Sequence, residues 1–82
     1  MQVDGMDRSQ EAYRVCLIDG TRGLVPENLV AEMMGLERRP GHGEVYRWLE
    51  RYKGDVEAAL ENLKTGKGIR PPFDRIALAE DN

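Results

Sequence analysis

The segment from residue 52 to residue 63 decides the expected fold, and it reads Tyr52-Lys53-Gly54-Asp55-Val56-Glu57-Ala58-Ala59-Leu60-Glu61-Asn62-Leu63. Gly54 can adopt the left-handed conformation in which helices commonly end, and Asp55 can accept hydrogen bonds from the free amides of a following helix. The apolar residues beyond this corner are spaced i, i+3, i+4 and i+7: Val56, Ala59, Leu60 and Leu63. The segment therefore predicts the end of one helix, a sharp corner at Gly54 and a second, amphipathic helix on a small core.

Two more helices are predicted on the N-terminal side of this corner. Residues 44–53 have a helical period, and their apolar face would consist of Val45, Trp48, Leu49 and Tyr52. The stretch 37–43 contains Pro40 and two glycines and is predicted to be a loop. Before it, Pro26 and Glu27 form a helix start signal. The helix that they begin would carry Leu29, Val30, Met33 and Met34.

The N-terminal part of the chain gives a weaker pattern. Residues 1–8 are short, polar and glycine-containing, and we expect them to be disordered. Residues 10–18 fit either a helix that stops at Gly20 or a short β-rich run over 13–18. We predict the helix, with the strand as the alternative.

The C-terminal part loses the helical period after Lys64. Pro71 and Pro72 prevent a helix from continuing. Residues 67–82 are therefore predicted to be either a flexible tail or a segment that docks on the domain or on a partner. Docking would use the apolar residues of this tail, which are Phe73, Ile76 and Leu78.

The corner and the helix after it resemble a known family. The pattern Gly-Asp-Val-Glu-x-Ala-Leu-x-x-Leu, which begins at Gly54, is similar to the last helix of ubiquitin-associated (UBA-like) three-helix domains. Met34-Gly35-Leu36 is similar to their Met-Gly-Phe loop. Residues 26–66 also resemble the N-terminal module of elongation factor Ts. This second similarity is carried by Leu29-Val30-Ala31-Glu32-Met33, Arg39-Pro40-Gly41-His42-Gly43 and Gly54 to Asn62.

Periodicity and resemblance together predict an all-α protein. The expected architecture is a small UBA-like three-helix bundle with an additional N-terminal helix and flexible tails, and its helical domain spans residues 9–66. With 82 residues the chain is one domain at most, and its compact core leaves no room for a deep cleft. The resemblance implies a non-catalytic protein-interaction module, an adaptor for a ubiquitin-like fold or a translation-factor-type GTPase.

The composition limits the cellular compartments and the classes of partner that we expect. The net charge of −3 disfavours nucleic acid and anionic membrane as partners. The single cysteine, Cys16, cannot form an internal disulfide, and the chain has neither a secretory signal nor an apolar run of about 18 residues. We therefore expect a soluble monomer in the cytoplasm or another reducing intracellular compartment.

No residue pattern points to catalysis. His42 is the only histidine, and with Cys16 far from it in sequence there is no zinc-ligand spacing and no nucleophile-base constellation. Glu57 and Glu61 are one helical turn apart and fit a solvated helix face. We therefore expect a protein that is not an enzyme, with no catalytic residue, cofactor or metal.

The resemblance places the partner surface at the Met-Gly-Leu loop and at the end of the last helix. Its residues would be Met34, Gly35, Leu36, Leu60, Leu63 and Lys64. A second candidate surface is basic and consists of Arg38, Arg39, Arg47 and Arg51. The basic surface could dock an acidic protein or RNA, and charged helix faces are also commonly just solvated.

The alternative function is a small helix-turn-helix-like regulator that binds nucleic acid. Three short helices with a glycine corner also describe that motif, and residues 55–64 would form its recognition helix. Three carboxylates against Lys64 would make this helix repel phosphates, so we favour the protein-interaction hypothesis.

Overall fold

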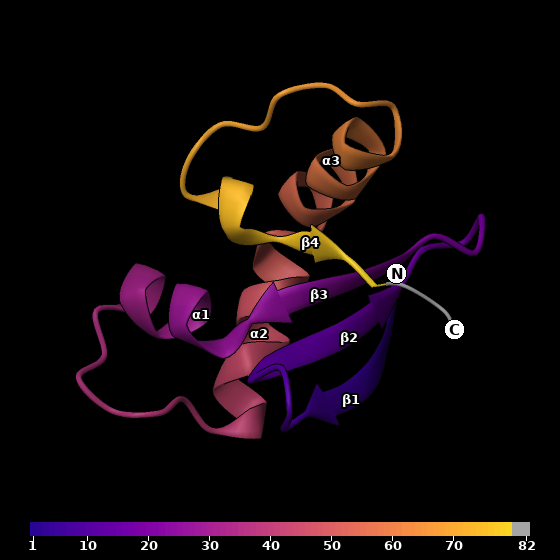
Figure 1. Ribbon diagram of the computed structural model, residues 1–82. Coiled ribbons are helices and arrows are strands. Elements are labelled where there is room, and N and C mark those ends of the chain that lie inside the picture. Colours follow the sequence, from indigo (N-terminus) through magenta and orange to yellow (C-terminus); the bar gives the residue numbers. More distant parts are fainter. Residues whose placement is uncertain (80–82) are drawn as a thin grey trace.

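The computed structural model describes residues 1–79 and combines a sheet with three α-helices (Figure 1). The strands are β1 (Gln2–Asp7), β2 (Ala12–Cys16), β3 (Arg22–Pro26) and β4 (Ala77–Leu78). The helices are α1 (Glu27–Met34), α2 (His42–Arg51), α3 (Lys53–Lys64) and a short 3-10 helix, η1 (Phe73–Arg75). The fold is therefore mixed α/β, and the prediction of an all-α helical bundle is wrong.

The four strands form one antiparallel sheet in the order β1-β2-β3-β4. Aspartates hold the turns of its first two hairpins: Asp7 accepts hydrogen bonds from the backbone and hydroxyl of Ser9, and Asp19 accepts one from the backbone of Thr21. The Ser9 hydrogen bond and the ion pair with Arg14 lower the pKa of Asp7 to about 2. The hydrogen bonds from Thr21 lower the pKa of Asp19 to about 2. Both turns are thus fixed by ionised side chains at neutral pH.

One face of the sheet carries the core, which explains why β2 is a strand. Tyr13, Val15 and Leu17 are buried, whereas Arg14 and Cys16 between them are only half-buried. This period of two puts every second side chain against the helices. Figure 1 shows α2 crossing behind the strands. The predicted helix over residues 10–18 is wrong, and the β-rich alternative is the one that forms.

The N-terminus also departs from the prediction. Residues 1–8 were expected to be disordered, but Gln2–Asp7 pairs with β2 as an edge strand. A register shift lies between Val3 and Gly5, and Gly5 has a φ of 105°. The two apolar residues of β1, Val3 and Met6, both pack against the core. The shift keeps them on the same face although they are three residues apart.

The predicted helical segments 26–34, 44–53 and 55–64 correspond to α1, α2 and α3, but the corner between the last two differs. Gly54 lies inside α3 and is not among the glycines with positive φ. The chain turns at Tyr52 instead, with φ −104° and ψ 20°, and no side chain caps α3. The predicted left-handed Gly54 and the predicted Asp55 cap are therefore wrong.

Replacing Gly54 by alanine should stabilise the protein. Gly54 has helical conformation, and a Cβ there would meet no atom within 4 Å. Because alanine has less freedom in the unfolded chain, we expect Gly54→Ala to raise the free energy of unfolding by about 0.4 to 1 kcal/mol. Urea unfolding measures this change. Gly66→Ala is the control, since Gly66 has a φ of 77° and alanine there should destabilise. A lower stability for Gly54→Ala would contradict the helical assignment.

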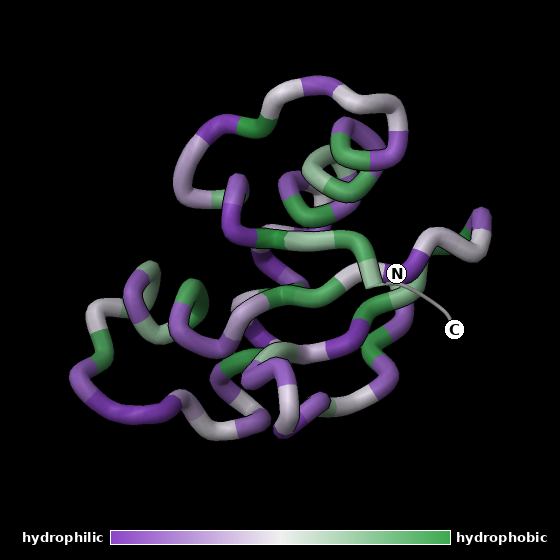
Figure 2. The backbone as a smooth tube through the Cα atoms, viewed as in Figure 1, coloured by the Kyte–Doolittle hydropathy of each residue, from purple (hydrophilic) through white to green (hydrophobic). Residues whose placement is uncertain are grey.

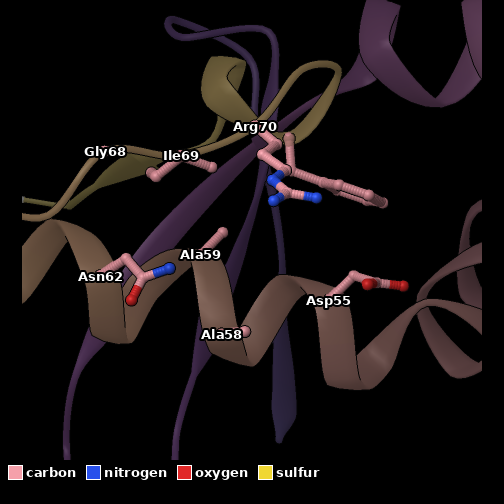
Figure 3. Close-up of a pocket in the computed structure, with 8 residues that line it drawn as sticks. Asp55, Ala58, Ala59, Asn62, Gly68, Ile69 and Arg70 are labelled. Carbon is pink, nitrogen blue, oxygen red and sulfur yellow. The ribbon is translucent and has the colours of Figure 1, made fainter.

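The C-terminal tail docks, which was one of its two predicted states. Ile76 is 2% exposed, and β4 pairs with β3. The segment before it passes over α3, and Figure 3 shows Ile69 and Arg70 facing Ala58 and Ala59 across a hollow of about 250 Å³. The last residues of the predicted tail, 80–82, lie outside the described residues.

Candidate functional site

The partner surface predicted from the resemblance is not assembled. Leu60 has no exposed surface and belongs to the core, so it cannot contact a partner. Leu63 is half-buried against the same core. Lys64 Nζ lies 3.4 Å from Asp19 Oδ2, at the turn between β2 and β3. Met34 instead lies beside α2. The end of α3 and the end of α1 therefore face different neighbours, and the predicted placement of Leu60 is wrong.

The Met34-Gly35-Leu36 motif forms the end of α1. Gly35 has a φ of 70° and closes the helix, with its amide donating to the carbonyl of Glu32. The amide of Leu36 donates to the carbonyl of Ala31, and the Leu36 side chain is half-buried. The sequence pattern is thus explained by a left-handed helix end that needs glycine. Of the three residues, Met34 is the one with an exposed apolar side chain, at 38%.

Two of the four predicted basic residues are neutralised. Arg38 donates two hydrogen bonds to the carboxylate of Glu44, at 2.8 and 3.0 Å. These bonds lower the pKa of Glu44 to about 2. Arg39 Nε lies 2.9 Å from Oε1 of Glu27, which is 8% exposed. Arg38 and Arg39 therefore hold the loop between α1 and α2 in place, and the middle of that loop is coloured as hydrophilic in Figure 2.

Arg47 and Arg51 are different, because neither forms an ion pair within residues 1–79. They are exposed and lie one turn apart on α2. Between them and the end of α1 is an open hollow of about 270 Å³. We call it the α1–α2 hollow, and its lining residues are Met33, Met34, Arg47, Trp48, Arg51 and Tyr52. The structure thus joins half of the predicted basic surface to Met34 of the predicted apolar surface.

Packed aromatic rings support the α1–α2 hollow from below. The ring centroids of Trp48 and Tyr52 are 5.0 Å apart, and Phe73 from η1 lies 6.3 and 6.0 Å from them. An ion pair between Arg75 and Glu32 fastens η1 to α1. The sequence predicted docking of the tail through Phe73 as one of two alternatives, but it did not show that Phe73 would pack against Trp48 and Tyr52. The available signal was Phe73 itself, a lone aromatic residue after two prolines.

The lining of the hollow combines flexible methionine side chains with rigid aromatic rings. Methionine side chains adapt their shape to an apolar partner, and the aromatic rings keep the floor in place. The arginine head groups supply charge at one side, with Arg51 also lying 5.6 Å from the centre of the Tyr52 ring. This arrangement can hold an apolar side chain and pair with carboxylates.

Comparisons with known proteins give no match among family models, curated proteins or solved structures. Within residues 1–79, no three metal-ligating side chains of His, Cys, Asp or Glu type gather in one place. In the same part of the chain no helix combines the length and apolarity needed to cross a bilayer.

Proposed function

We propose that this protein is a non-catalytic interaction module that binds an acidic, amphipathic helix of a partner protein at the α1–α2 hollow. One observation carries the proposal: an open, largely apolar hollow is lined by two arginines that form no ion pair within residues 1–79. A ubiquitin-like fold and a translation-factor-type GTPase, the partner classes expected from the sequence, are the candidates that we propose for the protein that carries this helix.

The chemistry of the hollow selects the partner helix. Apolar side chains at i, i+3 and i+4 would contact Met33, Met34 and the edge of Tyr52. Carboxylates on the flanking positions would pair with Arg47 and Arg51, which relieves the repulsion between two like charges one turn apart. The docked helix thus supplies both the apolar cover and the negative charge that this surface lacks.

The proposal predicts that charge decides binding to peptides of equal apolarity. Two synthetic helical peptides would share Leu and Phe at i, i+3, i+4 and i+7, with Glu at the polar positions of one and Lys in the other. The emission of Trp48, the only tryptophan, reports docking because its ring lines the hollow. We expect the acidic peptide to bind and the basic one not to bind. A double charge reversal, Arg47→Glu with Arg51→Glu, should abolish or invert this preference.

A matched control keeps the total charge constant. Lys67→Glu with Arg70→Glu makes the same change of charge on exposed residues of the tail, outside the hollow. This variant should bind the acidic peptide as the unchanged protein does. Equal binding of both peptides, or equal loss in both double variants, would contradict the proposal. Steeply salt-dependent binding of mixed DNA or RNA oligonucleotides would favour the helix-turn-helix-like alternative instead.

Met34 supplies the second test of the hollow. Because its side chain is 38% exposed at the end of α1, Met34→Asp should leave the fold intact. We expect it to weaken binding of the acidic peptide by about 1 kcal/mol, since it puts a carboxylate in an apolar contact. Isothermal titration gives the affinity, and urea unfolding gives the stability. Unchanged affinity in a folded variant would place the interface elsewhere.

A further inference from the structure

A second hollow lies beside the loop between α1 and α2, and the proposed function does not use it; of the predicted surfaces it includes only Arg39. Its volume is about 520 Å³, against about 270 Å³ for the α1–α2 hollow. Small-molecule sites commonly have volumes of about 300 to 1,000 Å³. We call it the Tyr13 pocket, and the lining residues that the argument uses are Met6, Arg8, Tyr13, Glu27, Arg39 and His42.

A buried tyrosine is fixed in this pocket by an exposed histidine. Tyr13 is 1% exposed, and its hydroxyl lies 2.9 Å from Nδ1 of His42. Burial and the charge of Glu27 raise the pKa of Tyr13. The hydroxyl therefore stays protonated and can donate a hydrogen bond to Nδ1 of His42. When Nδ1 accepts this hydrogen bond, the ring N–H of His42 is on Nε2. Because His42 is exposed, that N–H can be a donor for a ligand.

The charged groups of the pocket favour an anion. Glu27 is 8% exposed, and its carboxylate is already paired with Nε of Arg39 at 2.9 Å. Arg8 is exposed in the turn between β1 and β2 and has no ion pair within residues 1–79. Two arginines against one carboxylate leave one positive charge in excess. Both guanidinium groups present N–H donors in a geometry that suits carboxylate and phosphate oxygens.

The pocket also has an apolar side. Met6 from β1 is half-buried, and Pro40 is buried beside His42. A free inorganic ion would leave these groups unused, whereas an organic anion would cover them with its carbon frame. The combination of donors and an apolar wall therefore suits a ligand with one charged end and one compact apolar body.

We propose that the Tyr13 pocket binds a small organic anion, one carboxylate or phosphate on a compact apolar frame. The charged end lies between Arg8 and His42, and the frame lies against Met6 and Pro40. Arg39 stays with Glu27 and shapes the pocket as a positioning residue. This pocket shares no lining residue with the α1–α2 hollow, so the anion-binding proposal is tested independently of the proposed function.

Nuclear magnetic resonance titration of the full chain tests the proposal with three aromatic probes. Phenylacetate carries a carboxylate, phenyl phosphate carries a phosphate and benzylamine carries a positive charge on a similar frame. We expect one of the two anions to shift the amide signals of Gly41, His42 and Gly43 in a saturable way, with a Kd of about 1 mM or tighter. The tighter anion identifies the charged end. Benzylamine should cause no such shift.

Substitution of Arg8 shows whether the pocket supplies the charge. Its side chain has no ion pair within residues 1–79, so Arg8→Gln should fold normally, and it should weaken the better anion at least about tenfold. Lys67→Gln removes the same charge at an exposed site of the tail and should bind normally. No saturable shift with either anion, equal binding of benzylamine, or equal affinity in Arg8→Gln would each overturn the proposal.

Discussion

Truncation of Leu60 to alanine is expected to lower the free energy of unfolding by about 2 to 5 kcal/mol, a large part of the stability of a small domain. Leu60 is fully buried and lies between α3 and the sheet, where its side chain meets the backbone of β3 at Gly23. Alanine would leave a cavity that the sheet cannot close by moving a single side chain. Urea unfolding followed by circular dichroism measures the loss.

Leu63→Ala is the matched control for this prediction. Both leucines lie on α3 and lose the same atoms, but Leu63 is only half-buried at the edge of the core. We expect Leu63→Ala to cost clearly less than Leu60→Ala, because part of its surface is already in water. Equal losses of stability in the two variants would contradict the burial of Leu60. The same conclusion would follow if Leu60→Ala kept its stability but no longer bound a partner protein.

The helices could be predicted from the sequence because their signals are local. Val45, Trp48 and Leu49 recur with the helical period, and all three are buried in α2. Pro26 marks the start of α1, which begins one residue later. Such patterns depend on neighbours within one or two turns, so no knowledge of the rest of the chain is needed.

The sheet could not be predicted because each of its strands is incomplete alone. β1 has polar residues on its open face, so it looks like a solvated terminus until β2 pairs with it. β4 has two residues and depends on β3 for its hydrogen bonds. The alternation of Tyr13 and Val15 in β2, which Leu17 continues after the strand, was visible, but a strand of five residues also fits part of a helix. Pairing between distant segments decides all three cases.

Only part of the candidate site could be predicted from the sequence, because the rest depends on contacts between distant segments. The i, i+4 spacing of Arg47 and Arg51 places both on one face of a helix from sequence alone. Which arginines are free could not be known, since the Arg39 pair with Glu27 joins separate elements. The assumption of a bundle brought Leu60 and Lys64 next to Met34. The sheet instead receives Leu60 in its core.

Addition of one methyl group at Gly23 is the second large effect that we expect. A Cβ at this position would lie 2.4 Å from Cδ2 of Leu60, too close for the two atoms to coexist without movement. The φ of Gly23 is not positive, so alanine causes no backbone strain there. Gly23→Ala should therefore cost about 1 to 3 kcal/mol through the contact alone. Urea unfolding measures the loss.

A double-mutant cycle identifies the cause. Leu60→Val shortens the side chain that meets the new methyl group, so Gly23→Ala should cost less in a Leu60→Val background than alone. We expect the two changes to be coupled by about 0.5 to 3 kcal/mol. Leu63→Val should show no such coupling with Gly23→Ala. If the costs of Gly23→Ala and Leu60→Val simply add, α3 does not lie against β3 at this point. The position of α3 on the sheet then has to be revised, together with the burial of Leu60 that follows from it.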